Sequence, residues 1–272
     1  RAQEVFGDTN IEITTAGDRH LEAVVGTLEF RELYVNSKVS GWIKDLRMLS
    51  NIAQDEPQAA YTGFTKGLLH RWSYVQRTIP DIGHCFRPLE NAIRNEFIPR
   101  LVGRPISDHE RDIFELPVRH GGLGIPNPVK TSEEEFKNSI FITSKLAKQV
   151  YDQDIEASPD LNDIRANKWS VDQGKDLRHK NRIKELKDNP ETSMYMRRLL
   201  DLSCEKGAGV WLTALPIQSI GYALNKEDFT GGIMLRYGFR IPKLPTHCGC
   251  GKQNSIDHAL TCARGGYVCL LY

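Results

Sequence analysis

The chain has 272 residues, 40% of them hydrophobic, which is enough for one large domain or two small ones with a buried core. Its 36 Lys and Arg balance 35 Asp and Glu, so net charge gives no argument for a nucleic-acid partner and only local clustering can supply one. No apolar run reaches the roughly 20 residues that span a bilayer, and no signal segment is found, so no membrane partner is expected. Because the chain opens on "RAQEVFGDTN" without an initiator Met, we expect a fragment or a misassigned start.

The first predicted element is a β-hairpin within residues 1–26. "NIEITTAG" alternates apolar and polar residues, a turn is expected at Ala16-Gly17-Asp18, and "RHLEAVVG" supplies the second strand. The apolar spacing then becomes helical, with buried stripes predicted over residues 35–49, 61–75 and 89–97. Prolines are expected to mark the ends of these helices, and Pro99 is expected to end or kink the third. A short fourth helix should begin at Ser107, with Glu110 completing a capping box.

A loop and a charged segment follow. Three glycines and three prolines within residues 117–128 exclude a helix there and predict a fixed loop. Residues 152–192 are rich in charges and poor in apolar residues, which predicts a linker or a solvated helix. The expected architecture is therefore mainly α: an N-terminal hairpin over 1–26, a helical region over 27–151, a charged connector over 152–192 and a C-terminal region over 193–272.

Cysteine usage points to a metal site rather than to disulfides. Six cysteines in 272 residues are too few and too uneven for a disulfide scaffold, and without a secretory signal a reducing compartment is expected. Cys85 and Cys204 are isolated and are expected to be ordinary buried or half-buried thiols. The other four lie in the last 25 residues, mostly within "HCGCGKQNSIDHALTC".

This cluster predicts a structural Zn²⁺ site. Four donors suit a tetrahedral ion with no position left for water: Cys248, Cys250, His258 and Cys262. "SIDHALTCARGG" is typical of a short helix capped by Ser255 and Gly265, with Leu260 packed on the body, so the His and the last Cys lie one turn apart.

Two alternatives to this ligand set remain open. Only Gly249 separates the first two cysteines, whereas about two to four residues are usual in zinc knuckles. His247 or Cys269 could therefore replace one ligand. The other alternative is a pair of buried thiols with an incidental histidine.

Two basic segments are candidate nucleic-acid contacts. Clustered cations can bind phosphates, and in the charged connector the candidates are Arg178, Lys180, Arg182 and Lys184. Basic side chains also lie beside aromatic ones in "KGLLHRWSYVQR", where the candidates are Lys66, His70, Arg71 and Arg77. For both segments the pattern alone favours the alternative, which is an ordinary solvated helix face.

No catalytic motif is evident. The sequence contains no Asp-Asp pair typical of two-metal sites, no phosphate-binding loop with Lys-Ser or Lys-Thr, and no G-x-S-x-G. We therefore expect no active site, and no small-molecule substrate, in this chain.

Several stretches in order resemble the C-terminal part of a non-LTR (LINE-type) retrotransposon reverse transcriptase. They are "TTAGDRHLEAVVG", "FRPLENAIRNEFIPRLVGR", "LPVRHGGLGIPNP" and the terminal Cys-Cys-His-Cys run. Residues 207–266 are also similar to retroelement-like proteins abundant in cnidarian genomes. Glu22, where relatives usually have Gly, and the ending "GGYVCLLY" depart from the family pattern.

The resemblance implies a thumb over residues 27–116 that holds an RNA–DNA duplex, and zinc ligands at the four positions named above. It places the palm, with its catalytic aspartates and Mg²⁺, upstream of this chain. The chain would then be a partial RNA-directed DNA polymerase that contributes nucleic-acid binding without catalysis. The partners would be RNA and DNA in the nucleus or cytoplasm, with the oligomeric state open. The alternative is a non-enzymatic host protein derived from a retroelement, acting as a zinc-dependent module that binds nucleic acid or protein.

Overall fold

The computed structural model describes residues 2–10, 13–153, 161–241, 245–255, 258 and 261–264. It is mainly helical, as predicted, and the described residues form one small antiparallel sheet. The elements of the first half are α1 (Ala2–Phe6), β1 (Gly17–His20), β2 (Ala23–Gly26), α2 (Leu28–Ile52), α3 (Pro57–Gly63), η1 (Phe64–Leu68), α4 (Leu69–Thr78), η2 (Gly83–Phe86), α5 (Arg87–Ala92), η3 (Ile93–Phe97), α6 (Ile98–Val102) and α7 (Asp108–Phe114). Those of the second half are η4 (Val118–His120), α8 (Pro128–Tyr151), α9 (Leu161–Asp188), α10 (Met194–Ser203), α11 (Val210–Thr213), η5 (Gln218–Ile220) and α12 (Lys226–Tyr237).

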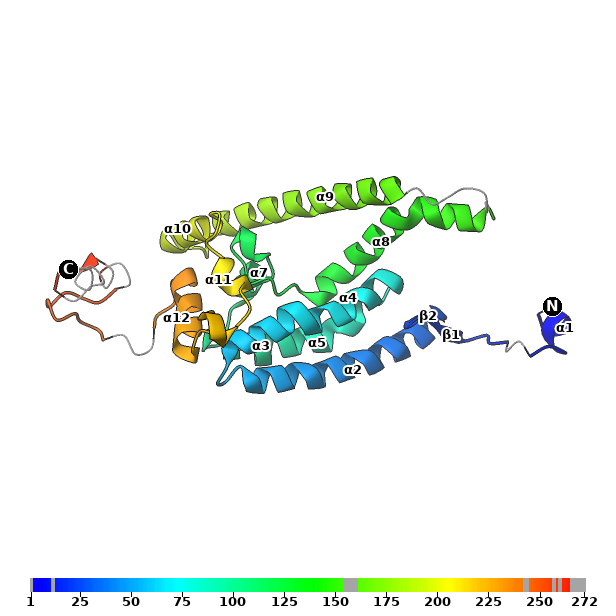
Figure 1. Ribbon diagram of the computed structural model, residues 1–272, viewed down its shortest axis with the longest axis horizontal. Helices are drawn as coiled ribbons and strands as arrows, with labels where there is room; N and C mark the ends of the chain where they lie inside the picture. The colour runs from blue at the N-terminus through cyan, green and yellow to red at the C-terminus, as the bar shows by residue number, and fades with distance from the viewer. Residues whose placement is uncertain are drawn as a thin grey trace.

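Three long helical segments pack side by side to form the main bundle: α2, α3–η1–α4 and α5–η3–α6 (Figure 1). The three predicted apolar stripes form their buried faces, as expected for amphipathic helices. Aromatic rings fill the centre. Phe64 stacks on Phe97 with ring centroids 4.8 Å apart, and Trp42 lies 6.1 Å from Trp72.

The second and third segments each contain one π-helical turn, η1 and η3. In η3 the amide of Ile98 donates to the carbonyl of Ile93, which replaces the usual α-helical bond immediately before Pro99. A proline ring collides with the carbonyl four residues back in a regular α-helix, and a wider turn relieves that collision. The third helix therefore continues through Pro99 and ends at Gly103, whose φ is 74°.

The N-terminal hairpin has a different register from the predicted one. Its strands are Gly17–His20 and Ala23–Gly26, so the predicted first strand over "NIEITTAG" is wrong. Residues 13–16 lie outside any strand, residues 11 and 12 lie outside the described part of the chain, and residues 2–6 are helical. The turn falls at Leu21 and Glu22, both with positive φ (48° and 62°), a conformation typical of two-residue hairpin turns.

Contacts with the bundle explain this turn. The hydroxyl of Tyr34 donates to the carbonyl of Glu22 at 2.7 Å, and the hydroxyl of Tyr74 donates to the carbonyl of Leu21. The carboxylate of Glu22 pairs with Lys38 at 3.1 Å and also with Arg19. These contacts stabilise a left-handed conformation for which glycine is the least strained residue.

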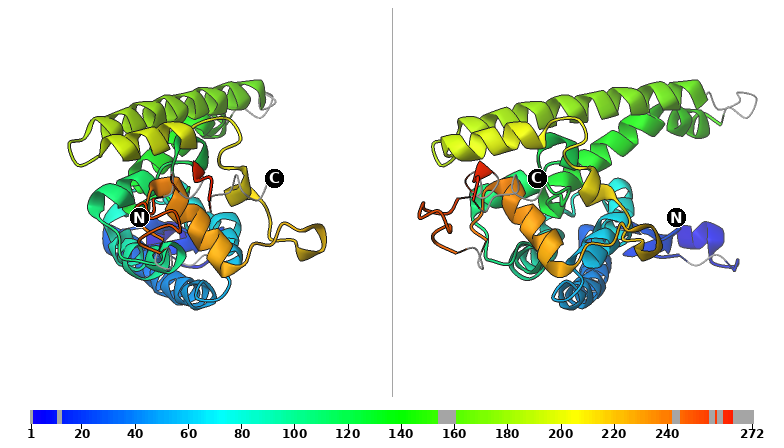
Figure 2. Two further views of the ribbon diagram at one scale, coloured as in Figure 1. Left: turned by 90° about the vertical axis from the view of Figure 1, so that its left-hand side faces the viewer. Right: turned by 60° about the vertical axis from the view of Figure 1, so that its left-hand side comes forward.

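Helices α8 and α9 form an antiparallel pair that lies over the bundle (Figures 1 and 2). The charged connector is thus largely a solvated helix, one of the two predicted outcomes, although residues 154–160 lie outside the described part. Only Ile183 and Leu186 of α9 are buried. Ion pairs also join α9 to its neighbours: Lys145–Asp163, Lys175–Glu135, Arg178–Glu134, Arg182–Asp112, Arg119–Asp176 and Lys187–Asp201.

The loop of residues 117–127 is held in place from several helices. Side-chain donors bind its carbonyls: Tyr61 that of Leu123 (2.6 Å), Arg111 that of Ile125 (2.8 Å), Tyr237 that of Gly121 (3.0 Å) and Arg236 that of Val118 (3.0 Å). Gly122 has no room for a side chain, because a Cβ there would lie 1.9 Å from the carbonyl oxygen of Leu116. The structure confirms the predicted fixed loop, but the expectation of no helix within residues 117–128 is wrong at two places: Val118–His120 form a 3₁₀ turn, and Pro128 begins α8.

Candidate metal centre and nucleic-acid surface

The four predicted zinc ligands lie together beyond α12, at the end of the molecule opposite the hairpin (Figure 1). Their ligand atoms all lie within 4.8 Å of one another. The sulfur of Cys248 is 3.6 Å from that of Cys262, and the sulfur of Cys250 is 3.1 Å from Nε2 of His258. The cluster is compatible with a metal ion held by three sulfurs and one imidazole.

A short turn positions the two N-terminal ligands. The amide of Asn254 donates to the carbonyl of Thr246 at 2.8 Å, and the amide of Cys248 donates to the carbonyl of Lys252 at 2.9 Å. Gly251 adopts a φ of 87°, where a side chain would be strained. The turn brings both cysteine sulfurs into the cluster despite the single residue between them.

One helical turn positions the other two ligands. The amide of His258 donates to the hydroxyl of Ser255 at 3.0 Å, which confirms the predicted cap. The amide of Cys262 donates to the carbonyl of His258 at 2.8 Å, an α-helical spacing that puts the two side chains on one face. Leu260 and Gly265, also named in the prediction, lie outside the described residues.

Of the two alternative ligands, His247 is the one that lies in the described structure, and it does not join the cluster. His247 does not belong to the four-residue group, and its Nδ1 lies 3.2 Å from the hydroxyl of Thr246. Cys269 lies outside the described residues. The other two cysteines behave as ordinary thiols, because burial raises the pKa of both Cys85 and Cys204.

The donor set can be tested against tetrahedral Zn²⁺. Zn–S bonds of about 2.3 Å give sulfur–sulfur edges of about 3.8 Å in a tetrahedron, and the Cys248–Cys262 separation is 3.6 Å. Soft thiolates with one imidazole are also the donors that Zn²⁺ accepts in structural sites. The residues therefore fit such an ion.

The candidate basic residues of the first segment lie on η1 and α4, and all four are exposed. Arg71 forms an ion pair with Asp45 at 2.5 Å. Lys66, His70 and Arg77 form no ion pair with any residue of the described structure. Three of the four candidates therefore remain available to an anionic partner.

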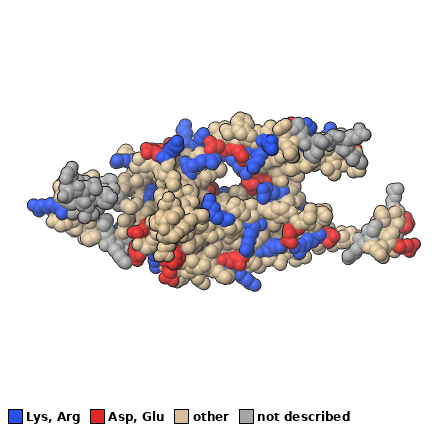
Figure 3. All heavy atoms as spheres, viewed as in Figure 1, with Lys and Arg blue, Asp and Glu red and all other residues tan. Residues whose placement is uncertain are grey.

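The candidate residues of the second segment lie on α9, and most are already paired. Arg178 binds Glu134, Lys180 binds Asp176 at 2.8 Å, and Arg182 binds Asp112 at 2.8 Å. Among the four, Lys184 alone lacks an ion pair with a described residue. Basic and acidic side chains are correspondingly mixed over the face seen in Figure 3. A nucleic acid at α9 would have to compete with these carboxylates.

No family model, curated protein or solved structure matches this chain. Within the described residues, every helix is too short or too polar to cross a lipid bilayer.

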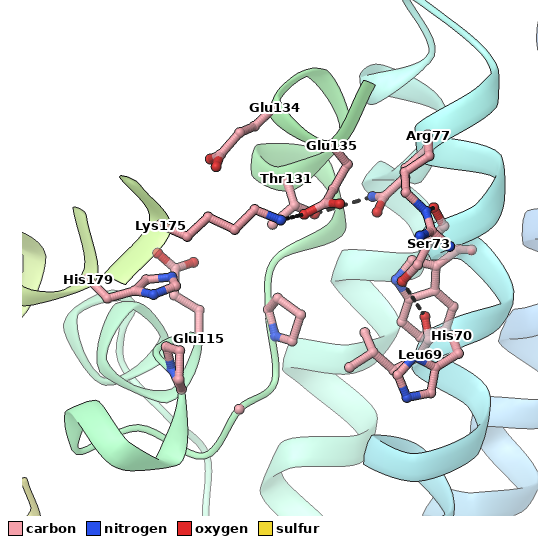
Figure 4. Close-up of a pocket in the computed structure, with 15 residues that line it drawn as sticks. Leu69, His70, Ser73, Arg77, Glu115, Thr131, Glu134, Glu135, Lys175 and His179 are labelled. Atoms are coloured by element: carbon pink, nitrogen blue, oxygen red, sulfur yellow. Dashed lines mark hydrogen bonds and ion pairs between the residues drawn. The ribbon is translucent and has the colours of Figure 1, made fainter. Parts of the chain in front are cut away.

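Sequence reasoning missed one further feature, a cavity of about 490 Å³ between α4 and the α8–α9 pair (Figure 4). Its lining combines His70 and Arg77 with residues that no motif singled out, including Ser73, Lys175 and His179. These residues are up to about a hundred positions apart in the sequence, so no local signal could have indicated them.

Proposed function

We propose that this chain is the thumb and zinc-knuckle part of a non-LTR reverse transcriptase. It would bind nucleic acid through its helical surface and hold one structural Zn²⁺ through Cys248, Cys250, His258 and Cys262. It would carry no polymerase active site of its own. The convergence of four soft donors at one point is the observation that carries the proposal, together with the ordered sequence resemblance.

A structural role for the ion follows from the number of protein ligands. Four protein donors complete a tetrahedron and leave no position for a reactive water. The ion would fix the turn of residues 246–254 against His258 and Cys262. Metal binding of this kind stabilises a segment that has little core of its own.

The nucleic-acid part of the proposal draws support from the surface of η1 and α4. Lys66, His70 and Arg77 lie on one continuous helical segment and are not neutralised by described carboxylates. The two unpaired cations, Lys66 and Arg77, would release counterions on meeting phosphates, and this release favours binding.

Metal analysis of the purified chain tests the zinc site. We expect one Zn²⁺ per chain, lost on His258→Ala because one of four ligands is removed. His247→Ala is the matched control and should retain the ion, since that imidazole lies outside the cluster. A zinc content near zero, or one that His258→Ala leaves unchanged, would contradict the proposal.

Two further assays test the polymerase assignment. A fluorescent RNA–DNA hybrid should bind the chain with an affinity that falls steeply as salt rises. Primer extension with Mg²⁺ and deoxynucleotides should give no product from this chain alone. Template-dependent synthesis would refute the absence of an active site, and zinc binding without hybrid binding would favour the alternative of a host-derived module.

A further inference from the structure

The cavity between α4 and the α8–α9 pair has the size of a small-molecule site. Its volume of about 490 Å³ lies within the range of roughly 300 to 1,000 Å³ found for ligand pockets. Figure 4 shows residues of α4 on one side and Lys175, His179 and Glu115 on the other. The space is open between them.

The floor of the cavity is apolar and fixed. Leu69 and the two prolines Pro117 and Pro126 line it, together with Gly124. The hydrogen bonds from Tyr61 and Arg111 to Leu123 and Ile125 hold this loop at 2.6 and 2.8 Å. A flat apolar ring could therefore rest on the floor without reorganising it.

The wall opposite α4 carries charges that are already balanced. Lys175 pairs with Glu135, Arg178 with Glu134, and Lys130 binds Glu115 at 3.1 Å. These carboxylates therefore present little uncompensated negative charge to an anion in the cavity.

The α4 wall is different, because its cation, Arg77, forms no ion pair with a carboxylate of the described residues. His70, Ser73 and Arg77 follow one another at spacings of three and four residues, which puts them on one side of the helix. Nε of Arg77 donates to the carbonyl of Ser73 at 3.1 Å, and its terminal nitrogens form no ion pair within the described part of the chain. His70 and Arg77 are both exposed, so they lie at the rim.

We propose that this cavity binds one unstacked nucleotide of a single strand. The base lies on the floor formed by Leu69, Pro117 and Pro126, and the phosphate lies at His70 and Arg77. The apolar floor suits the base, the hydroxyls of Ser73 and Thr131 in the lining suit the sugar and base edges, and the cation at the rim suits the phosphate. This inference rests on the proposed nucleic-acid binding and adds the kind of strand and the place of contact.

Fluorescence anisotropy with the zinc-loaded full chain tests the proposal. The probes are a labelled single-stranded oligothymidylate of twelve nucleotides and the same backbone carrying abasic sites throughout. We expect the oligothymidylate to bind roughly tenfold more tightly than the abasic strand, which is the low end of what stacking on an aromatic side chain contributes per base, because this floor is aliphatic.

Two variants distinguish the contribution of the base to binding from that of the phosphate. Ser73→Phe places a ring in the cavity without changing charge, and only a hydrogen bond within its own helix, to Leu69, is lost. It should weaken oligothymidylate binding about tenfold and leave the abasic strand unaffected. Arg77→Gln should weaken both strands and lower the slope of log affinity against log salt by about one.

Lys184→Gln is the matched control for Arg77→Gln. It also removes one exposed cation without a described ion pair, but Lys184 does not line the cavity. Its effect on both strands should be smaller than that of Arg77→Gln. Thermal melting and zinc content should show that all three variants are folded.

The proposal is overturned if the two strands bind equally, if Ser73→Phe binds oligothymidylate like the parent chain, or if Lys184→Gln matches Arg77→Gln. In those cases the proposed function survives, provided that the RNA–DNA hybrid still binds. If the parent chain binds neither hybrid nor single strand, the proposed function itself fails and this inference fails with it.

Discussion

Substitutions in the ion pair between Arg111 and Glu90 should lower the stability of the fold more than most others. Nε and one terminal nitrogen of Arg111 donate to the two carboxylate oxygens of Glu90 at 2.7 and 2.8 Å. The side chains are only 4% and 12% exposed, and the remaining terminal nitrogen donates to the carbonyl of Ile125 in the loop of residues 117–127. Glu90→Ala would leave a buried guanidinium with one protein partner instead of two.

The expected cost follows from that burial. Removing one partner of a buried ion pair typically destabilises a protein by about 3 to 5 kcal/mol, because the other charge is left uncompensated. Replacing both residues, as in Glu90→Leu with Arg111→Met, removes the stranded charge but leaves the carbonyl of Ile125 without its donor. An unpaired buried carbonyl costs about 1 to 3 kcal/mol, so the double variant should recover part of the loss.

Urea unfolding followed by circular dichroism measures these differences. The matched control is Glu96→Ala, which breaks a second bidentate pair, with Arg47, whose side chains are far more exposed. Solvent screens that pair, so its loss should be close to the error of the measurement. The reasoning is refuted if Glu90→Ala destabilises the chain by less than about 1 kcal/mol, or by no more than Glu96→Ala does.

Three further predictions use the same unfolding assay. Ser107→Ala should lower the free energy of unfolding by about 1 kcal/mol, because it removes the capping box with Glu110. Ser107→Asp can still cap the helix and should retain most of the stability, so equal losses for the two variants would argue against the cap. Gly122→Ala should lower the free energy of unfolding by about 3 kcal/mol or more, because the new Cβ clashes with the carbonyl of Leu116. Gly41→Ala is the control: it lies in open space on α2, so the better helix-forming residue should raise the free energy of unfolding by about 0.5 to 1 kcal/mol. Burial lowers the pKa of His179, so the folded state takes up a proton less readily than the unfolded state. The free energy of unfolding therefore keeps its full value above the unfolded-state pKa of about 6.5 and falls as pH drops from there through the lower pKa of the folded state. His179→Gln should therefore lose less stability than the parent chain between pH 7 and 5. Identical slopes of the free energy of unfolding against pH would contradict a lowered pKa for His179.

Local patterns predicted the parts of the fold that depend on neighbours in sequence. The apolar stripe of α2, the capping box at Ser107 and the spacing of His258 and Cys262 all lie within one or a few helical turns. The hairpin register did not follow from the sequence, because its turn has neither glycine nor asparagine and depends on hydroxyls from Tyr34 and Tyr74.

Ion pairs between residues that are far apart in the sequence could not be predicted from local patterns either. The i, i+4 pair of Lys180 with Asp176 lies within one helix and could be read from spacing. Arg178 instead pairs with Glu134, which lies 44 residues away. The cavity depends on such long-range placement too, since its two walls come from α4 and α9. Sequence alone therefore did not identify the distant carboxylates that pair with the basic residues of α9, and it gave no sign of the cavity beside that helix.

The two π-helical turns have a consequence for how chain length can vary. In a regular α-helix, deleting one residue rotates everything beyond it by about 100° and moves the apolar stripe off the core. A π-turn holds one residue more than the α-helical turn that it replaces. Lys66 is exposed within η1, so its deletion would convert that turn to α-helix and leave Tyr61 and Trp72 on their present faces. The bundle thus contains sites where a helix can be shortened by one residue while both of its ends keep their partners.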